Sequence, residues 1–119
     1  MIVSYLKSKI HRARVTHSHL DYEGSLGIDE ELMNAAGLRE FERVEVYNVT
    51  NGERFSTYLI KEKPGSGQIG VYGAAAHKAK EGDIIIITSY CSLTDEQAEF
   101  HRPRVVLLDE NNRIKMTKS

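Results

Sequence analysis

The residues best suited to chemistry lie in three short segments, residues 22–25, 54–58 and 73–76. In the first segment Gly24 precedes Ser25, and a serine hydroxyl can attack the carbonyl of the preceding residue where the backbone is strained. This N→O acyl shift gives an ester, whose β-elimination leaves a dehydroalanine that hydrolyses to a pyruvoyl group and ammonia. A Gly-Ser pair in isolation usually only makes a turn, so the other segments must decide between the two interpretations.

The segment 54–58 offers two groups suited to an acidic substrate. Arg54 carries a planar guanidinium that can bind a carboxylate through two parallel hydrogen bonds. Tyr58 carries a phenol that can donate a proton at neutral pH. Strand alternation predicts Arg54 and Tyr58 on one face and Thr57 on the other, so Thr57 and Tyr58 can serve one site only if the strand twists, bulges or runs between chains. An ordinary edge strand with residues of high β-propensity is the alternative.

Three further features have both a functional and a plain interpretation. The small residues at 73–76 could let backbone N–H groups reach a substrate, or could simply fill a helix. Lys9 and His11 share one strand face and could line a site for an acidic substrate, although a solvated face is the default. His17 and His19 have no third and fourth ligand at a recognised spacing, so we expect no metal site.

Size and composition indicate one domain over residues 1–119. The 16 basic and 17 acidic residues give a net charge of −1, which does not favour a nucleic-acid partner. The single cysteine, Cys91, cannot form an internal disulfide, and this is typical of a cytoplasmic protein. The apolar run at 84–87 is too short to cross a bilayer, so we expect no membrane association.

Short strands must position most of these residues. Alternating and β-rich patterns predict strands over residues 2–17, 44–49, 54–60, 68–72, 84–90, 105–108 and 113–116. We expect Gly24 and Ser25 in a turn, and Asn51-Gly52 as a two-residue hairpin loop. The continuous apolar run of the strand at 84–90 suggests burial on both faces, and the last hairpin should cross residues 109–112.

Capping residues bound two short helices. Asp29 is suited to the N-cap of the first, and Gly37 to the left-handed position that ends it. Thr94 and Gln97 form a capping-box pair for the second. The predicted helices cover residues 30–36 and begin again at 95, and the Ala-rich segment 73–80 could form a helical turn or two. Short strands with short helices between them suggest a small β-barrel.

Taken together, the chain resembles the pyruvoyl-dependent aspartate 1-decarboxylase family over about residues 1–110. The motifs that match are Lys9-Ile10-His11-Arg12, Val15-Thr16, Tyr22-Glu23-Gly24-Ser25, Ile28-Asp29, Ala35-Ala36-Gly37, Val49-Thr50-Asn51-Gly52, Arg54-Phe55-Ser56-Thr57-Tyr58, Gly73-Ala74-Ala75-Ala76-His77 and Gly82-Asp83. Their common order and close spacing make the resemblance specific. It implies a mainly β fold, a small double-psi β-barrel with short helices, that assembles as a homotetramer with active sites between neighbouring subunits.

The resemblance also implies an activity. The chain would cut itself between Gly24 and Ser25 into residues 1–24 and 25–119, and Ser25 would become a covalent pyruvoyl cofactor, with no metal and no pyridoxal phosphate. The reaction would convert L-aspartate to β-alanine and carbon dioxide through a Schiff base, in the cytoplasm, as a step of pantothenate biosynthesis. A maturation factor could be a further partner. The alternative from another class is a non-catalytic small β-barrel binding module, which would stay as one intact chain.

By position, the resemblance makes Tyr58 the proton donor. The residues that it implies for substrate binding are Thr57, Gly73, Ala74, Ala75, Arg54 and Lys9, and those that it implies as pocket-lining are His11, Tyr22 and Tyr72. Two positions depart from the family: Tyr72 stands where Asn is usual, and Tyr47 where Trp is frequent. Asn offers a short amide with donors and an acceptor, whereas Tyr offers one hydroxyl on a larger ring. The departure at Tyr72 therefore bears on side-chain contacts to the reacting centre.

Overall fold

The computed structural model describes residues 1–119, and nine strands dominate it. The strands are β1 (Ile2–Arg14), β2 (His17–His19), β3 (Ser25–Asp29), β4 (Arg43–Asn48), β5 (Arg54–Glu62), β6 (Ile69–Tyr72), β7 (Ile84–Thr94), β8 (Arg104–Leu108) and β9 (Ile114–Lys118). The helical elements are α1 (Glu30–Ala36), the 3₁₀ turn η1 (Gly73–His77) and α2 (Asp95–Ala98). The predicted mainly β class with short helices is confirmed.

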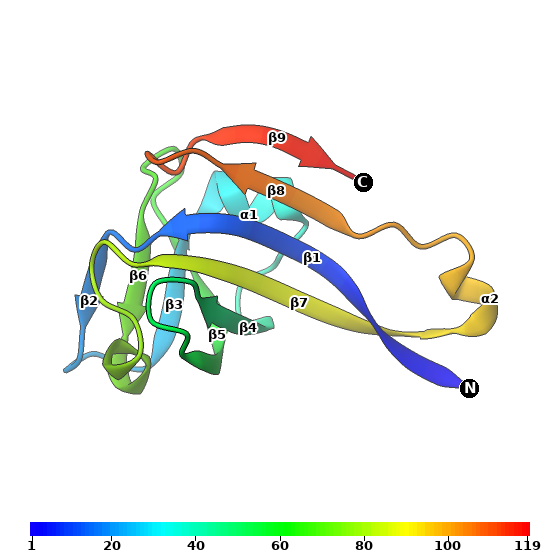
Figure 1. Cartoon of the computed structure of the whole chain (residues 1–119), viewed down its shortest axis with the longest axis horizontal. Coiled ribbons are helices and arrows are strands. Elements are labelled where there is room, and N and C mark those ends of the chain that lie inside the picture. Colours follow the sequence, from blue (N-terminus) through cyan, green and yellow to red (C-terminus); the bar gives the residue numbers. More distant parts are fainter.

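The strands form one mixed sheet in the order β2-β6-β3-β5-β4-β7-β1-β8-β9. The long antiparallel pair β1 and β7 carries α2 and the N-terminus to one end of the molecule, and β2, β3 and β6 lie together at the other end (Figure 1). Parallel neighbours occur in the pairs β1–β8, β2–β6 and β3–β5. The more specific double-psi barrel stays a prediction. None of the helical elements has the length and apolar composition that a membrane span requires.

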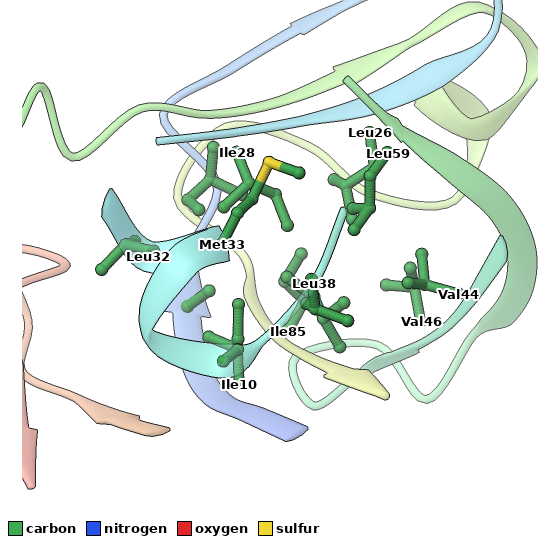
Figure 2. Packing of buried hydrophobic residues seen from close by; sticks show 14 of the residues in the cluster. Ile10, Leu26, Ile28, Leu32, Met33, Leu38, Val44, Val46, Leu59 and Ile85 are labelled. Atoms are coloured by element: carbon green, nitrogen blue, oxygen red, sulfur yellow. The ribbon is translucent and has the colours of Figure 1, made fainter. Parts of the chain in front are cut away.

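The core is a cluster of 19 buried hydrophobic residues supplied by α1, by the strands β1 and β3–β8, and by segments that connect them. Met33 of α1 points toward the interior that also holds Ile28 and Leu59, whereas Leu32 lies on another side of the helix (Figure 2). Each fully buried aliphatic side chain of this kind contributes about 1.5–3 kcal/mol relative to an exposed one. This packing holds β3 and β5 in a fixed relation to each other, which matters for the site described below.

The first predicted helix is confirmed at residues 30–36. The Asp29 carboxylate accepts a hydrogen bond from the Glu31 amide (2.8 Å), and Gly37 ends the helix with φ of 70°. Asp29 also accepts hydrogen bonds from the Gly65 and Gly67 amides, at 2.9 and 2.8 Å. One buried carboxylate therefore caps α1 and fixes the loop between β5 and β6.

The second predicted helix is also confirmed, because α2 begins after a complete capping box of Thr94 and Gln97. The last predicted hairpin is present as β8 and β9, although β9 continues to Lys118. The segment expected to be helical after residue 72 forms the short 3₁₀ turn η1.

The two-residue hairpin predicted at Asn51-Gly52 is wrong. The last ladder pair is Tyr47 with Arg54, so the connection is longer. Asn48 is the physical reason: its side-chain oxygen accepts a hydrogen bond from the Thr50 amide (2.9 Å), which closes the turn earlier.

Two strand predictions also need correction. The strand expected over residues 2–17 ends at Arg14, and His17–His19 forms a separate strand parallel to β6. A shift in the β1–β7 register, with φ of 65° at Arg12, bends the chain before that point. In β7, burial alternates: Ile85 and Ile87 are fully buried, whereas their neighbours 84 and 86 are only half-buried in the single chain.

Candidate active site

Ser25 lies at the start of a buried strand rather than in a turn, so that prediction is wrong. Gly24 forms a bend, and Ser25 begins β3 with only 3% of its surface exposed. Ser25 pairs with Tyr72 of β6 in antiparallel register. The sequence concealed β3 because all five of its residues are buried, which leaves no alternation to recognise.

The strand register brings Gly24 and Ser25 to the segment 54–58. The parallel β3–β5 ladder begins at the pair Leu26 and Leu59, so the residues just before this pair are Ser25 on one strand and Tyr58 on the other. Here the ladder has ended, and cavities open beside the two strands. This arrangement places the Gly24–Ser25 peptide bond beside Thr57 and Tyr58.

Two cavities reach the Gly24–Ser25 bond, one of them lined by Ser25 and the other by Gly24. The first cavity has a volume of about 370 Å³ and is lined by Tyr22, Glu23, Ser25, Tyr58, Ile60 and Tyr72. The second has a volume of about 390 Å³ and is lined by Gly24, Phe55, Ser56, Thr57, Tyr58, Ala74, Ala75 and Lys78. Tyr58 borders both cavities. Thr57 and Tyr58 are neighbours on β5, and both line the cavity that contains Gly24.

Gly73 packs directly against Gly24. A Cβ atom on Gly73 would lie 2.5 Å from the Gly24 Cα and 2.7 Å from its amide nitrogen, which no side chain could tolerate. Gly73 also has φ of 70°, a conformation that favours glycine. With Ala74 and Ala75 in the wall of the second cavity, the predicted small-residue segment lies against the residue that precedes Ser25.

The structure does not bring the predicted cationic residues to these cavities within one chain. Lys9 and His11 lie on β1, which β7, β4 and β5 separate from β3 in the sheet order. Arg54 lies on the exposed face of β5, with its guanidinium carbon 4.6 Å from the centre of the Tyr47 ring. The buried Nδ1 of His11 has no hydrogen-bond partner, and burial, followed by the charges of Lys9, Arg12 and Lys118, lowers the pKa of His11.

Tyr72 lines the first cavity, and its hydroxyl is engaged away from Ser25. The hydroxyl donates a hydrogen bond to the Glu62 carboxylate and lies 2.5 Å from Nε2 of His17. Burial, followed by the contact with Glu62, raises the pKa of the Tyr72 phenol, which therefore stays protonated at neutral pH. Sequence reasoning missed Glu62 and assigned His17 no role beyond the rejected metal site. The only available signal was the strand period that places Glu62 on the same face of β5 as Tyr58.

Another cavity, of about 470 Å³, lies at the C-terminal end of β1. It is lined by Arg12, Arg14, Ile84, Leu108, Asp109, Glu110 and Lys115. It holds charges of both signs and none of the residues predicted to act chemically, so we do not connect it with the site at Ser25.

Comparison with known proteins gives a consistent result. A family model described as aspartate decarboxylase matches residues 1–115. The aspartate 1-decarboxylase of Bordetella pertussis is 57% identical over 110 residues, which are 92% of this chain and 90% of the relative. The enzyme of that name from Ralstonia pickettii is 56% identical over 113 residues (95% and 94%), and that from Methylococcus capsulatus is 53% identical over 117 residues (98% and 93%).

Proposed function

The chain belongs to the aspartate decarboxylase family and is a lyase that decarboxylates aspartate, and we propose that it does so with a pyruvoyl group formed from its own Ser25. The observation that carries this proposal is that Ser25 lines one cavity and Gly24 another, with Tyr58 in the lining of both and Gly73 packed against Gly24. The products would be β-alanine and carbon dioxide.

The surroundings of Ser25 suit self-cleavage. The Ser25 oxygen would attack the Gly24 carbonyl carbon, and the peptide C–N bond would break as the ester forms. Burial of Ser25 limits competing attack by water, and Thr57 lies on the side of the Gly24 cavity, where its hydroxyl can hold the carbonyl oxygen. Elimination then breaks the Ser25 Cβ–O bond and releases the Gly24 carboxylate, and one water molecule converts the dehydroalanine to a ketone and ammonia.

The residues of the first cavity suit the decarboxylation. A pyruvoyl ketone condenses with the substrate amine and accepts the electrons released when the carboxylate leaves. Tyr58 borders the same cavity as Ser25 and would deliver a proton to the carbon that lost the carboxylate. Tyr22, Ile60 and Tyr72 provide apolar surface that limits access of water.

The charge of the lining supports a site shared between chains. Aspartate carries two carboxylates, yet none of the six residues that line the first cavity is a cation, and Glu23 is acidic. A neighbouring copy that brings Lys9, or the exposed Arg54, to the cavity would supply the missing charge. This missing charge supports our proposal of active sites between subunits of a homotetramer, with His11 beside Lys9 in the shared part.

Mixing two inactive variants tests this shared site. Lys9→Ala and Tyr58→Phe would each disable every site when alone. Co-expressed in equal amounts, they should regain about a quarter of the wild-type activity, because a quarter of the sites would receive both intact residues. The measurement is the activity of the mixed assembly, with light scattering to establish its mass. An active monomer, or a mixture no better than its components, would contradict the shared site.

The unusual Tyr72 gives a further prediction. Tyr72→Asn should change kcat for aspartate by less than about tenfold, or ~1.4 kcal/mol of barrier. The reason is that the Tyr72 hydroxyl is already engaged by Glu62 and His17, so it supplies no proton to the reaction. The measurement is kcat of the fully processed variant. A larger gain would show that an amide at this position takes part in the chemistry.

Intact mass spectrometry of the purified protein tests the proposed function most directly. We expect two fragments, residues 1–24 and 25–119, of which the larger is lighter by one ammonia than a simple hydrolytic product. A non-catalytic binding module would remain a single chain. The enzyme would act in the cytoplasm, where the family supplies β-alanine for pantothenate, and the rate of cleavage with and without cell extract would reveal a maturation factor.

A further inference from the structure

Two glycines that face each other leave a hollow beside the first cavity. Gly27 of β3 pairs with Gly70 of β6. A Cβ atom on Gly27 would overlap the Glu62 carboxylate, and one on Gly70 would overlap the Tyr72 hydroxyl and lie 2.5 Å from Nε2 of His17. The hollow is therefore filled by side chains from three strands, with a carboxylate, a phenol and an imidazole in contact.

The hydrogen bonds within this cluster are mutually consistent. The Tyr72 hydroxyl has one proton, which it donates to Glu62. The 2.5 Å contact with His17 must then use an N–H on Nε2 as the donor, and this same nitrogen lies 3.3 Å from the Glu62 carboxylate. On the other side of the ring, Nδ1 of His17 lies 2.9 Å from the Thr16 hydroxyl. The Tyr72 hydroxyl is thus held from two sides, by β2 and by β5.

The anchored hydroxyl fixes the position of the Tyr72 ring. The ring stacks on Tyr22, with centroids 5.5 Å apart and planes inclined by 16°, and on His19 at 6.1 Å and 8°. It lines the same cavity as Ser25. Tyr22 is 62% exposed and lies in the loop before the Gly24–Ser25 bond, whereas Tyr72 is buried. The position of the stacked rings is therefore fixed by the anchored Tyr72.

We propose that Glu62 and His17 are positioning residues for substrate selectivity, because they lock the Tyr72 ring as a wall that limits the length of the amino acid accepted beside Ser25. The inference rests on the proposed function, since it takes Ser25 as the reacting position. The locked wall would admit L-aspartate and exclude L-glutamate, which has the same charges and one more methylene group. Without the anchor, the ring could turn about its side-chain bonds and make room for the longer substrate.

The test compares kcat/KM for L-aspartate and L-glutamate in Tyr72→Phe, Glu62→Ala and the double variant. Because the ratio of the two values is independent of the amount of processed enzyme, incomplete self-cleavage does not affect it. In each single variant, the ratio of kcat/KM for aspartate to kcat/KM for glutamate should fall about tenfold. This is the lower end of the discrimination that one methylene group gives in a fitted pocket. The double variant should lose no more than the larger single loss, because Glu62 acts through the Tyr72 hydroxyl.

Two matched variants complete the experiment. Glu62→Gln keeps an oxygen that can accept from Tyr72, so it should retain most of the preference that Glu62→Ala loses. Glu40→Gln changes a carboxylate that lies 3.9 Å from the Nζ atom of Lys61, the residue next to Glu62 on β5. This variant should leave the preference for aspartate unchanged.

Three results would overturn the inference. These are an unchanged preference in both single variants, losses that multiply in the double variant, or a loss in Glu62→Gln equal to that in Glu62→Ala. In each case the enzyme still processes and decarboxylates, so the proposed function stands. A wild-type chain that stays uncut and acts on neither amino acid would overturn the proposed function and the inference together.

Discussion

The Ser25→Ala variant should purify as one uncut chain with no decarboxylase activity. Without the hydroxyl, nothing at this position can attack the Gly24 carbonyl, and no ketone can form. The loss of activity should be complete rather than partial. The Ser25 oxygen starts maturation, and the Ser25 carbon atoms become the reacting ketone. Intact mass spectrometry reports the cleavage, and carbon dioxide release from aspartate reports the activity.

Ser18→Ala is a suitable control for this experiment. Ser18 lies on β2, which β6 separates from the strand of Ser25, and its hydroxyl donates a hydrogen bond to the Ala79 carbonyl at 3.0 Å. This variant should be processed and active. If Ser25→Ala were still cut at this bond, the cleavage would not depend on the serine oxygen, and the proposed origin of the cofactor would be wrong.

Tyr58→Phe should separate maturation from turnover. The variant keeps Ser25 and Thr57 and should cleave itself, since the phenyl ring fills the same place between the two cavities. Turnover should fall by about 10²–10⁴-fold, the usual size for a lost general acid. Tyr58 is 39% exposed in the single chain, so the substitution creates no large buried void. The measurement is kcat per pyruvoyl group in fully processed protein.

The control for Tyr58 is Tyr5→Phe. Tyr5 lies on β1 near His101, remote from both cavities, and loses the same hydroxyl group. Its turnover should remain close to that of the wild type. Near-normal turnover in processed Tyr58→Phe would remove Tyr58 from the mechanism and would require another proton donor.

Local signals in the sequence determined the helices and most strands. Asp29 and Gly37 bound α1, and Thr94 with Gln97 starts α2, because each cap involves residues at most a few positions apart. The strand face shared by Arg54 and Tyr58 also followed from alternation alone. The sequence motifs likewise determined the family, since their residue types and order need no structure to be read.

The alternation of apolar and polar residues did not reveal the strand whose two faces are both buried. The turn residues likewise did not reveal a loop that is closed by a side chain. Ser25 begins a strand without alternation, and only its pairing with Tyr72 places it. The loop after β4 was misjudged because the Asn48 side chain closes the turn, which the Asn-Gly pair does not reveal.

The arrangement of the site was decided by the tertiary structure alone. Thr57 and Tyr58 share a cavity with Gly24, and Tyr58 shares one with Ser25, because the parallel ladder of β3 and β5 ends at that level. No local pattern in the sequence encodes where a ladder ends. The anchoring of Tyr72 joins residues 10 and 55 positions away along the chain. Such contacts depend on the register of three strands, which is set by the packing of the whole core, whereas caps and turns depend only on near neighbours.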